Sequence, residues 1–203
     1  MKAPKVAKTV LGSLMLLSSV AANAALIPST ASGTGPYNNS PSLIDDGAFP
    51  AESSGWNQAD KVWWNGTGVT LTLDFGSVYN VADVMLSVDN NDNYAVEYST
   101  DNSTWNPLFN VLAAYGEIGF GMDTMSSVAG SAEYVAGIEF AVTSARYLRI
   151  RATGGDNMYS VGELQAFGSL PGNGNGSVPE PATLALLGLG LAGLGVARRR
   201  KRD

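Results

Sequence analysis

Short runs in which apolar and polar residues alternate constrain the fold of this chain more than any other feature. Residues 69–75 read VTLTLDF, so every second side chain is apolar. A period of two is typical of a strand with one buried face. Similar runs cover residues 81–88, 93–99, 136–142, 146–152 and 161–167. Turn-forming residues separate these runs, and no stretch before the C-terminal tail has helical periodicity over three turns. We therefore predict an all-β fold, an antiparallel jelly-roll β-sandwich.

The composition excludes several kinds of chemistry. The 203 residues, of which 45% are hydrophobic, suffice for one globular domain with appendages. The sequence has neither cysteine nor histidine, which excludes disulfides, thiolate nucleophiles, the usual zinc sites and histidine general bases. A bound metal would have to be a hard cation held by oxygen ligands.

Charge is distributed unevenly along the chain. Lys2, Lys5 and Lys8 lie at the start, and residues 198–202 are all basic. From residue 45 to residue 163 there are four basic and sixteen acidic residues, a balance of −12. Because nucleic-acid phosphates require a basic surface, we predict no nucleic-acid partner. An acidic domain suits cations or neutral ligands.

The first 24 residues have the three parts of a secretion signal. MKAPKVAK is basic, residues 9–22 form a mainly apolar run without charge, and Ala22-Asn23-Ala24 is a small-x-small cleavage site. We expect a signal peptide over residues 1–24 and a mature chain from Ala25. The alternative, a transmembrane helix, requires a longer apolar run.

The C-terminal tail has the composition of a tethered membrane segment. Residues 169–177 form a Gly/Asn-rich linker, and the sixteen residues 182–197 are uncharged. As a helix they would reach about 24 Å, and the basic cluster that follows should stay cytoplasmic. Its glycines also allow helix pairing through small faces.

The same tail, with Val178, Pro179, Glu180 and Pro181 before the apolar helix and basic cluster, resembles the PEP-CTERM sorting signal of Gram-negative bacteria. The resemblance covers residues 178–203. It implies that an exosortase, a membrane transpeptidase, reads the signal and removes it. It also implies export, a transient inner-membrane anchor, and association with extracellular polysaccharide or biofilm.

Five short motifs stand in order along the predicted β-rich part of the chain. These motifs are SLIDDG (42–47), LTLDFG (71–76), YSTDNSTW (98–105), ARYLRI (145–150) and YSVGEL (159–164). Together they resemble the discoidin, or coagulation-factor type C, domain, whose jelly roll is galactose-binding-like and includes family 32 carbohydrate-binding modules. The resemblance covers most of residues 40–168, and the strand pattern is most simply explained by one discoidin-like domain over residues 25–168.

The family resemblance also implies a structural Ca²⁺ between the early loop and the late glutamate. Carried over, it makes Asp46 and Glu163 side-chain ligands, with backbone oxygens from Leu43, Ala48 and Ser53. Calcium accepts such mixed carboxylate and carbonyl sets. The alternative is that Asp46 caps a turn and Glu163 pairs with an arginine. Residues 89–93 begin like an EF-hand loop but lack its glycine and glutamate, which favours a polar turn.

Aromatic and polar residues in predicted loops are candidates for sugar binding, which commonly combines an aromatic face with hydrogen bonds. The tract WNQADKVWWNG (56–66) has three tryptophans, of which we expect at least one in the core. We predict an exposed platform at Trp63 or Trp64, with Asn91, Asp92 and Tyr115 as neighbours.

We expect structural roles for two further aromatic residues and for three arginines. We predict that Tyr98 and Trp105 lie in the core, and that Arg146, Arg149 and Arg151 pair with carboxylates.

Three function classes follow from these observations. The favoured one is an exported, non-catalytic carbohydrate-binding module. The second is a structural matrix or surface protein without a small-ligand site. The third is a glycosidase or lyase with paired carboxylates such as Asp89 and Asp92, for which the chain offers few general acids.

Overall fold

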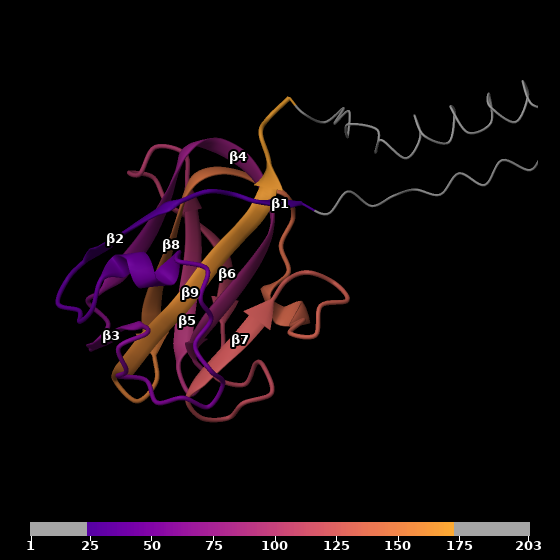
Figure 1. Ribbon diagram of the computed structural model, residues 1–203. Helices are drawn as coiled ribbons and strands as arrows, with labels where there is room; N and C mark the ends of the chain where they lie inside the picture. The colour runs from indigo at the N-terminus through magenta and orange to yellow at the C-terminus, as the bar shows by residue number, and fades with distance from the viewer. Residues whose placement is uncertain (1–23, 173–203) are drawn as a thin grey trace, which may run out of the picture.

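Nine β-strands and two short 3-10 helices are found in residues 24–172, the part of the chain that this computed structural model describes (Figure 1). They are β1 (Ala25–Leu26), β2 (Thr30–Thr34), η1 (Pro41–Ile44), β3 (Val62–Asn65), β4 (Thr70–Asp89), β5 (Asn93–Ser99), β6 (Asn106–Val111), β7 (Met122–Ser126), η2 (Ala136–Ile138), β8 (Thr143–Gly154) and β9 (Met158–Ser169). In this part of the chain, no helix has the length and apolarity to cross a membrane. The predicted signal peptide, residues 1–24, the predicted apolar helix and the sorting motif lie outside the described residues, apart from residue 24.

The strands form an antiparallel jelly-roll sandwich, as predicted. Strand β4 takes part in both layers and connects them. Its first part lies between β2 and β8, with Leu71 opposite Ile150 on β8. Its last part lies between β9 and β7, with Leu86 opposite Leu164 on β9. The strand order β1-β9-β4-β8-β5-β6 therefore runs from one layer into the other through this strand.

The turn predicted between residues 75 and 81 is absent. Residues 70–89 are one strand of 20 residues, whose pairing with β8 shifts register between Asp74 and Tyr79. At this shift Gly76 has φ +72°, and its N–H donates to Asp74 Oδ1 at 2.8 Å. The Gly76 region, which looked like a turn, is thus a local irregularity where the strand bends between the layers.

The strand predicted over residues 136–142 is also wrong. Residues 136–138 form η2, with Ile138 fully buried. Phe140 stacks on Phe109 of β6, with ring centroids 5.7 Å apart. The apolar residues of this segment therefore anchor a loop, and their alternation does not come from a pleated strand.

The core lies between the two layers and contains the residues that the alternation predicts. Leu71 and Leu73 are fully buried, and Phe75 is 6% exposed. Leu148 and Ile150 of β8 face them from the neighbouring strand. Burying each of these side chains contributes roughly 1.5–3 kcal/mol to the free energy of unfolding. The apolar residues that predicted the strands therefore also stabilise this layer of the sandwich.

The arginines of β8 pair with carboxylates, as predicted. Arg146 donates to Asp74, and Arg149 and Arg151 share Glu97 on β5. The prediction that Trp105 lies in the core is wrong, because its half-buried ring lies over the guanidinium of Arg149. Trp105 thus covers a cation on the outer face of the sheet.

Candidate ligand and cation sites

The loops predicted to bind ligand meet at one end of the sandwich, which is drawn lowest in Figure 1. The β8–β9 turn connects two of them, because Asn65 Nδ2 donates to Asn157 O and Asn91 Nδ2 donates to Asp156 Oδ2. The loop of residues 112–121 adjoins them through Asn90, whose N–H donates to Gly121 O at 3.0 Å. We call this surface the loop end. It lies opposite the end where β1 begins and β9 finishes.

The three tryptophans of residues 56–64 have different environments. Trp64 is fully buried beside Tyr159, so it is the predicted core tryptophan and its prediction as an exposed platform is wrong. Trp63 is half-buried and meets half-buried Trp56 edge to face, with ring centroids 5.2 Å apart. Alternation on β3 explains this difference, because the Trp63 side chain points away from the core when that of Trp64 points into it. The Trp56–Trp63 pair is the aromatic surface of the loop end.

Buried carboxylates support the turn between β4 and β5. This turn is polar, as predicted, and holds Asp89 and Asp92, which are 3% and 0% exposed. Asp92 Oδ1 accepts from the N–H of Asp156 at 3.0 Å, and its Oδ2 is buried without a partner. Burial raises the pKa of Asp89 to about 6 and that of Asp92 to about 7. Neither carboxylate faces solvent, where a substrate would bind.

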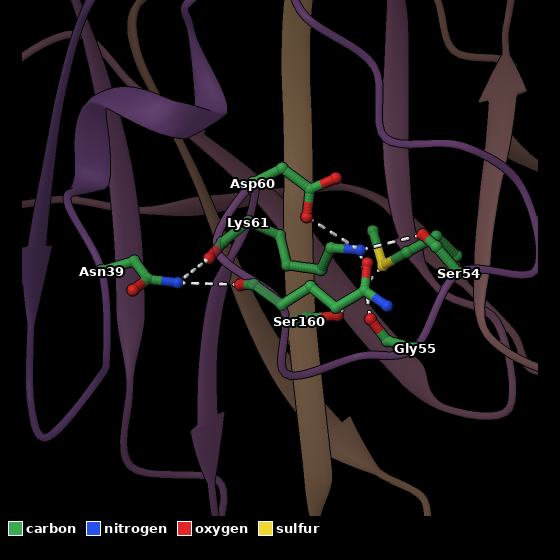
Figure 2. A network of polar contacts seen from close by, with 8 residues as sticks. Asn39, Ser54, Gly55, Asp60, Lys61 and Ser160 are labelled. Carbon is green, nitrogen blue, oxygen red and sulfur yellow. Dashed lines mark hydrogen bonds and ion pairs between the residues drawn. The ribbon is translucent and has the colours of Figure 1, made fainter.

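Lys61 holds the tryptophan-rich loop together from within the protein (Figure 2). Its side chain is fully buried, and Nζ donates to Ser54 Oγ at 2.9 Å and to Gly55 O at 3.1 Å. Nζ also lies 3.1 Å from Asp60 Oδ1. Asn39 donates to the carbonyl of Lys61 from the opposite side, as Figure 2 shows. Residues 54–61 are therefore held by hydrogen bonds although they have no regular secondary structure before β3.

Tyr115 and Phe120 occupy the remaining loop, residues 112–121. Tyr115 is half-buried against the core, and its ring covers Gly137, where any side chain would clash with it. Phe120 is 71% exposed and is the aromatic residue of this loop that faces solvent. Tyr115 and Asn91 as ligand neighbours remain predictions, whereas the prediction for Asp92 is wrong, because its side chain is fully buried.

The two predicted calcium-binding side chains come together at a cavity of about 170 Å³. Asp45, Asp46 and Glu163 contribute to its lining. Glu163 is fully buried; its Oε1 accepts from Gly47 N at 3.2 Å, and its Oε2 is buried without a partner. Burial raises the pKa of Glu163 to about 7. A buried carboxylate oxygen without a hydrogen bond beside two aspartates fits a hard cation.

The contacts of the other predicted ligands differ. Asp46 accepts from Ala48 N at 2.9 Å, so it also caps a turn, whereas no arginine pairs with Glu163 among the described residues. Leu43, Ala48 and Ser53 do not line the cavity, and Ser53 N donates to Met122 O on β7. These three backbone ligands remain predictions.

Sequence reasoning missed several residues at both sites. Asp156 and Asn157 fall in a predicted turn, and only the antiparallel pairing of β3 and β9 places that turn beside Asn65. Asp45 adjoins the predicted Asp46 and lines the same cavity. The tandem acids in SLIDDG were the available signal for Asp45, whereas nothing local marked Asp156.

The antiparallel jelly roll with its loops gathered at one end defines a discoidin-like β-sandwich. Residues 28–164 match the F5/8 type C domain, and the chain belongs to that family. Residues 177–201 match the PEP-CTERM protein-sorting motif, as predicted from the tail. No protein with a curated description matches the chain.

Solved structures of carbohydrate-binding modules are similar to this chain. The CBM32 of AlyQ in complex with 4,5-unsaturated mannuronic acid is 19% identical, with coverage of 72% of this chain and 98% of that chain and a TM-score of 0.47. CpGH89CBM32-5 from Clostridium perfringens, in complex with GalNAc-β-1,3-galactose, is 14% identical, with coverage of 70% and 99% and a TM-score of 0.48. A pectin-binding module is 16% identical, with coverage of 70% and 91% and a TM-score of 0.38.

Proposed function

We propose that this chain is an exported, non-catalytic carbohydrate-binding protein of an extracellular polysaccharide or biofilm matrix. Membership of the F5/8 type C family supports a binding role. The PEP-CTERM motif supports export, a transient inner-membrane anchor and handling by an exosortase, followed by an extracellular or cell-surface location. The loop end is the proposed glycan site.

The observation that carries this proposal is the Trp56–Trp63 pair beside loops rich in amides. A sugar ring packs its C–H face on an aromatic surface while its hydroxyls bond to polar groups nearby. Trp63 offers the aromatic surface, and Asn65 follows it at the end of β3. Asn91 adjoins the same β8–β9 turn, where its Nδ2 donates to Asp156 Oδ2 at 2.9 Å. An aromatic surface and amide side chains thus lie at the same end of the sandwich.

The charges of the loop end favour a neutral glycan. Its exposed charged residues include Glu52, Asp60, Glu117 and Asp156, and its cation, Lys61, is buried. The arginines of the described residues lie on β8, paired with Asp74 and Glu97. A polymer rich in carboxylates or sulfates would be repelled by this surface.

We propose further that Asp46 and Glu163 hold a structural calcium ion, with Asp45 beside them. The ion would supply the charge that leaves Glu163 ionised, and it would tie the loop of residues 45–47 to β9. Gly47 N already donates to Glu163 in this direction. Because this loop precedes the tryptophan-rich segment, the ion would brace the fold and take no part in chemistry on the ligand.

The burial of Asp89 and Asp92 supports a non-catalytic role. A glycosidase needs two carboxyl groups that both reach the scissile bond. Both of these side chains are enclosed by the fold and at most 3% exposed. They hold the turn beneath the proposed glycan surface.

Calorimetric titration with the producing cell's exopolysaccharide tests the proposal. The full chain would be studied in a detergent without a sugar head group, with calcium and again after chelation. We expect saturable heat in calcium, weakened by chelation and by Glu163→Gln. Trp63→Ala should reduce affinity at least about tenfold, the loss expected for one aromatic contact of roughly 1.5 kcal/mol.

Trp105→Ala is the matched control, because Trp105 is also half-buried but follows β5 at its end away from Asn93. Glycan affinity should be unchanged in this variant. Equal binding by wild type and Trp63→Ala would overturn the assigned surface. No heat in either condition would indicate a structural matrix component instead.

A further inference from the structure

A second group of acidic side chains lies where three segments meet at the side of the loop end. Glu52, Glu117 and Asp123 each place a carboxylate oxygen so that these oxygens all lie within 4.8 Å of one another. Among residues 24–172 this is the one group of three carboxylates drawn so close together. Asp123 comes from β7, Glu117 from the loop before β7, and Glu52 from the segment between η1 and β3.

Contacts with the surrounding fold fix the Asp123 side chain in this position. Its side chain is fully buried; Oδ2 accepts from Ile118 N at 3.3 Å, and Oδ1 is buried without a partner. Gly116 has φ +74°, and a side chain there would collide with the Asp123 carboxylate. The backbone of residues 116–118 therefore wraps closely around this carboxylate. A buried, half-satisfied carboxylate costs free energy unless a cation or a proton completes it.

A fourth acid adds negative charge to the group. Glu133 Oε2 is buried without a partner, and its pKa is raised by burial and then by Glu117. Burial, reinforced by Glu117 and Glu52, raises the pKa of Asp123 to about 6. None of the four ion pairs in residues 24–172 involves these acids. The group thus has negative charge in close proximity and no basic side chain to balance it.

We propose that Glu52, Glu117 and Asp123 bind a divalent cation, calcium by its preference for oxygen ligands, at a site separate from that of Asp46 and Glu163. Calcium accepts six to eight oxygens and leaves room for water beside three carboxylates. Glu133 lies next to Glu117 and would add charge without being required as a ligand.

The ion would have a defined mechanical effect. It would fasten the loop of residues 112–121, which carries Phe120, to β7 and to the segment that precedes the Trp56–Trp63 pair. Two loops of the loop end would then share one cross-link. The cation site stands whether or not a glycan binds there.

Calcium titration of the full chain by calorimetry, after chelation and dialysis, tests this site without any glycan. We expect two equivalents in the wild type and one in each of Glu163→Gln and Asp123→Asn. Glu117→Gln, at an exposed residue whose change leaves the fold intact, should weaken the same equivalent at least about tenfold, because ligand charge sets calcium affinity. Glu139→Gln, an exposed acid outside the group, is the control and should bind like the wild type.

The variants separate this site from the one proposed at Glu163. If Glu163→Gln still binds calcium and the double variant with Asp123→Asn does not, the acidic group is a cation site. The acidic group is also a cation site if the wild type binds one equivalent of calcium that is lost in Asp123→Asn and Glu117→Gln but kept in Glu163→Gln. That result would overturn the calcium site proposed at Glu163 and leave this one standing. Wild-type binding by both of these variants, or no binding by Glu163→Gln, would overturn the proposal.

Discussion

Trp105 lies over Arg149, with the guanidinium carbon 4.2 Å from the centroid of the indole ring. Arg149 Nε also donates to Glu97 Oε2 at 2.8 Å, so an aromatic face and a carboxylate hold the same cation. We predict that Trp105→Ala lowers the free energy of unfolding by about 1–2 kcal/mol. A double-mutant cycle with Arg149→Ala, measured by urea unfolding, should give a coupling energy of about 0.5–1 kcal/mol.

The Arg146–Tyr147 pair offers an internal comparison for this coupling. The guanidinium carbon of Arg146 is 4.9 Å from the ring of Tyr147, and its side chain is 38% exposed. Its coupling energy should be smaller, because solvent weakens the attraction. Equal coupling in the two pairs would contradict the role of desolvation.

Gly155 is required beside Asp92. It has φ +138°, and a side chain there would overlap the Asp92 carboxylate. Gly155→Ala should therefore cost about 2–4 kcal/mol in unfolding free energy, from backbone strain together with the clash. Gly130→Ala is the matched control, because Gly130 has φ +88° but nothing near the added carbon, and it should cost about 1 kcal/mol. The two variants would be compared by thermal unfolding. The loss of stability in Gly130→Ala measures backbone strain alone, and the additional loss in Gly155→Ala measures the clash with Asp92.

Asp92 should make stability depend on pH. Its folded pKa of about 7 lies above the ordinary value of 3.8, so the folded state loses stability as the pH rises from about 4 to about 7. This penalty on the folded state is relieved as the pH falls through the same range. Asp89 and Asp156 add to it, and the penalty on Asp89 is reduced by Lys61. In a chelator, unfolding free energy should therefore rise from pH 8 to pH 5.

Asp92→Asn isolates this contribution. The amide oxygen can still accept from Asp156 N, so the fold loses no hydrogen bond at Oδ1. At pH 8 the variant should be more stable than the wild type by roughly 1–3 kcal/mol, since a pKa unit corresponds to about 1.4 kcal/mol. The difference should shrink as the pH falls below 7 and should vanish near pH 4. Parallel pH profiles measured by urea unfolding would contradict this assignment.

Lys61 should control the order of the tryptophan-rich loop. Lys61→Met keeps the apolar stem but loses the donors to Ser54 and Gly55. Asp60 is half exposed, so no buried charge is stranded, and the global cost should stay within about 1–2 kcal/mol. Hydrogen exchange of residues 54–60 should accelerate while that of β5 stays unchanged. Unchanged exchange in the loop would show that packing alone orders it.

Local patterns predicted the strands well where both neighbours on the sheet are regular. Residues 93–99 match β5, and the runs at 146–152 and 161–167 lie within β8 and β9. The pattern failed at residues 76–80, because a glycine that resembles a turn in sequence produces a bend when flanking strands continue to pair. Strand β2, with the sequence TASGT, has no apolar signal and exists because β4 offers it a partner.

The candidate sites were predictable to the extent that chain neighbours define them. Composition and the tryptophan-rich tract indicated the loop end, but they could not decide between Trp63 and Trp64, because alternation identifies two faces and not which one is inside. The Trp105 error has a similar origin, since an arginine from a distant strand provides its cover. Asp123 acquires its acidic neighbours from residues 52 and 117, a proximity that no local pattern contains.

Strand β9 runs through the molecule from the loop end to the point where the chain continues toward its C-terminal tail, as Figure 1 shows. It is paired with β4 along much of its length and with β1 and β3 on its other edge. Antiparallel hydrogen bonds lie across the strand axis. A pull between a bound glycan and the tail would therefore act along β9 and load these bonds together in shear, instead of opening them one after another. Along this line the pairing of β9 with β1, β3 and β4 would share the load across both of its edges.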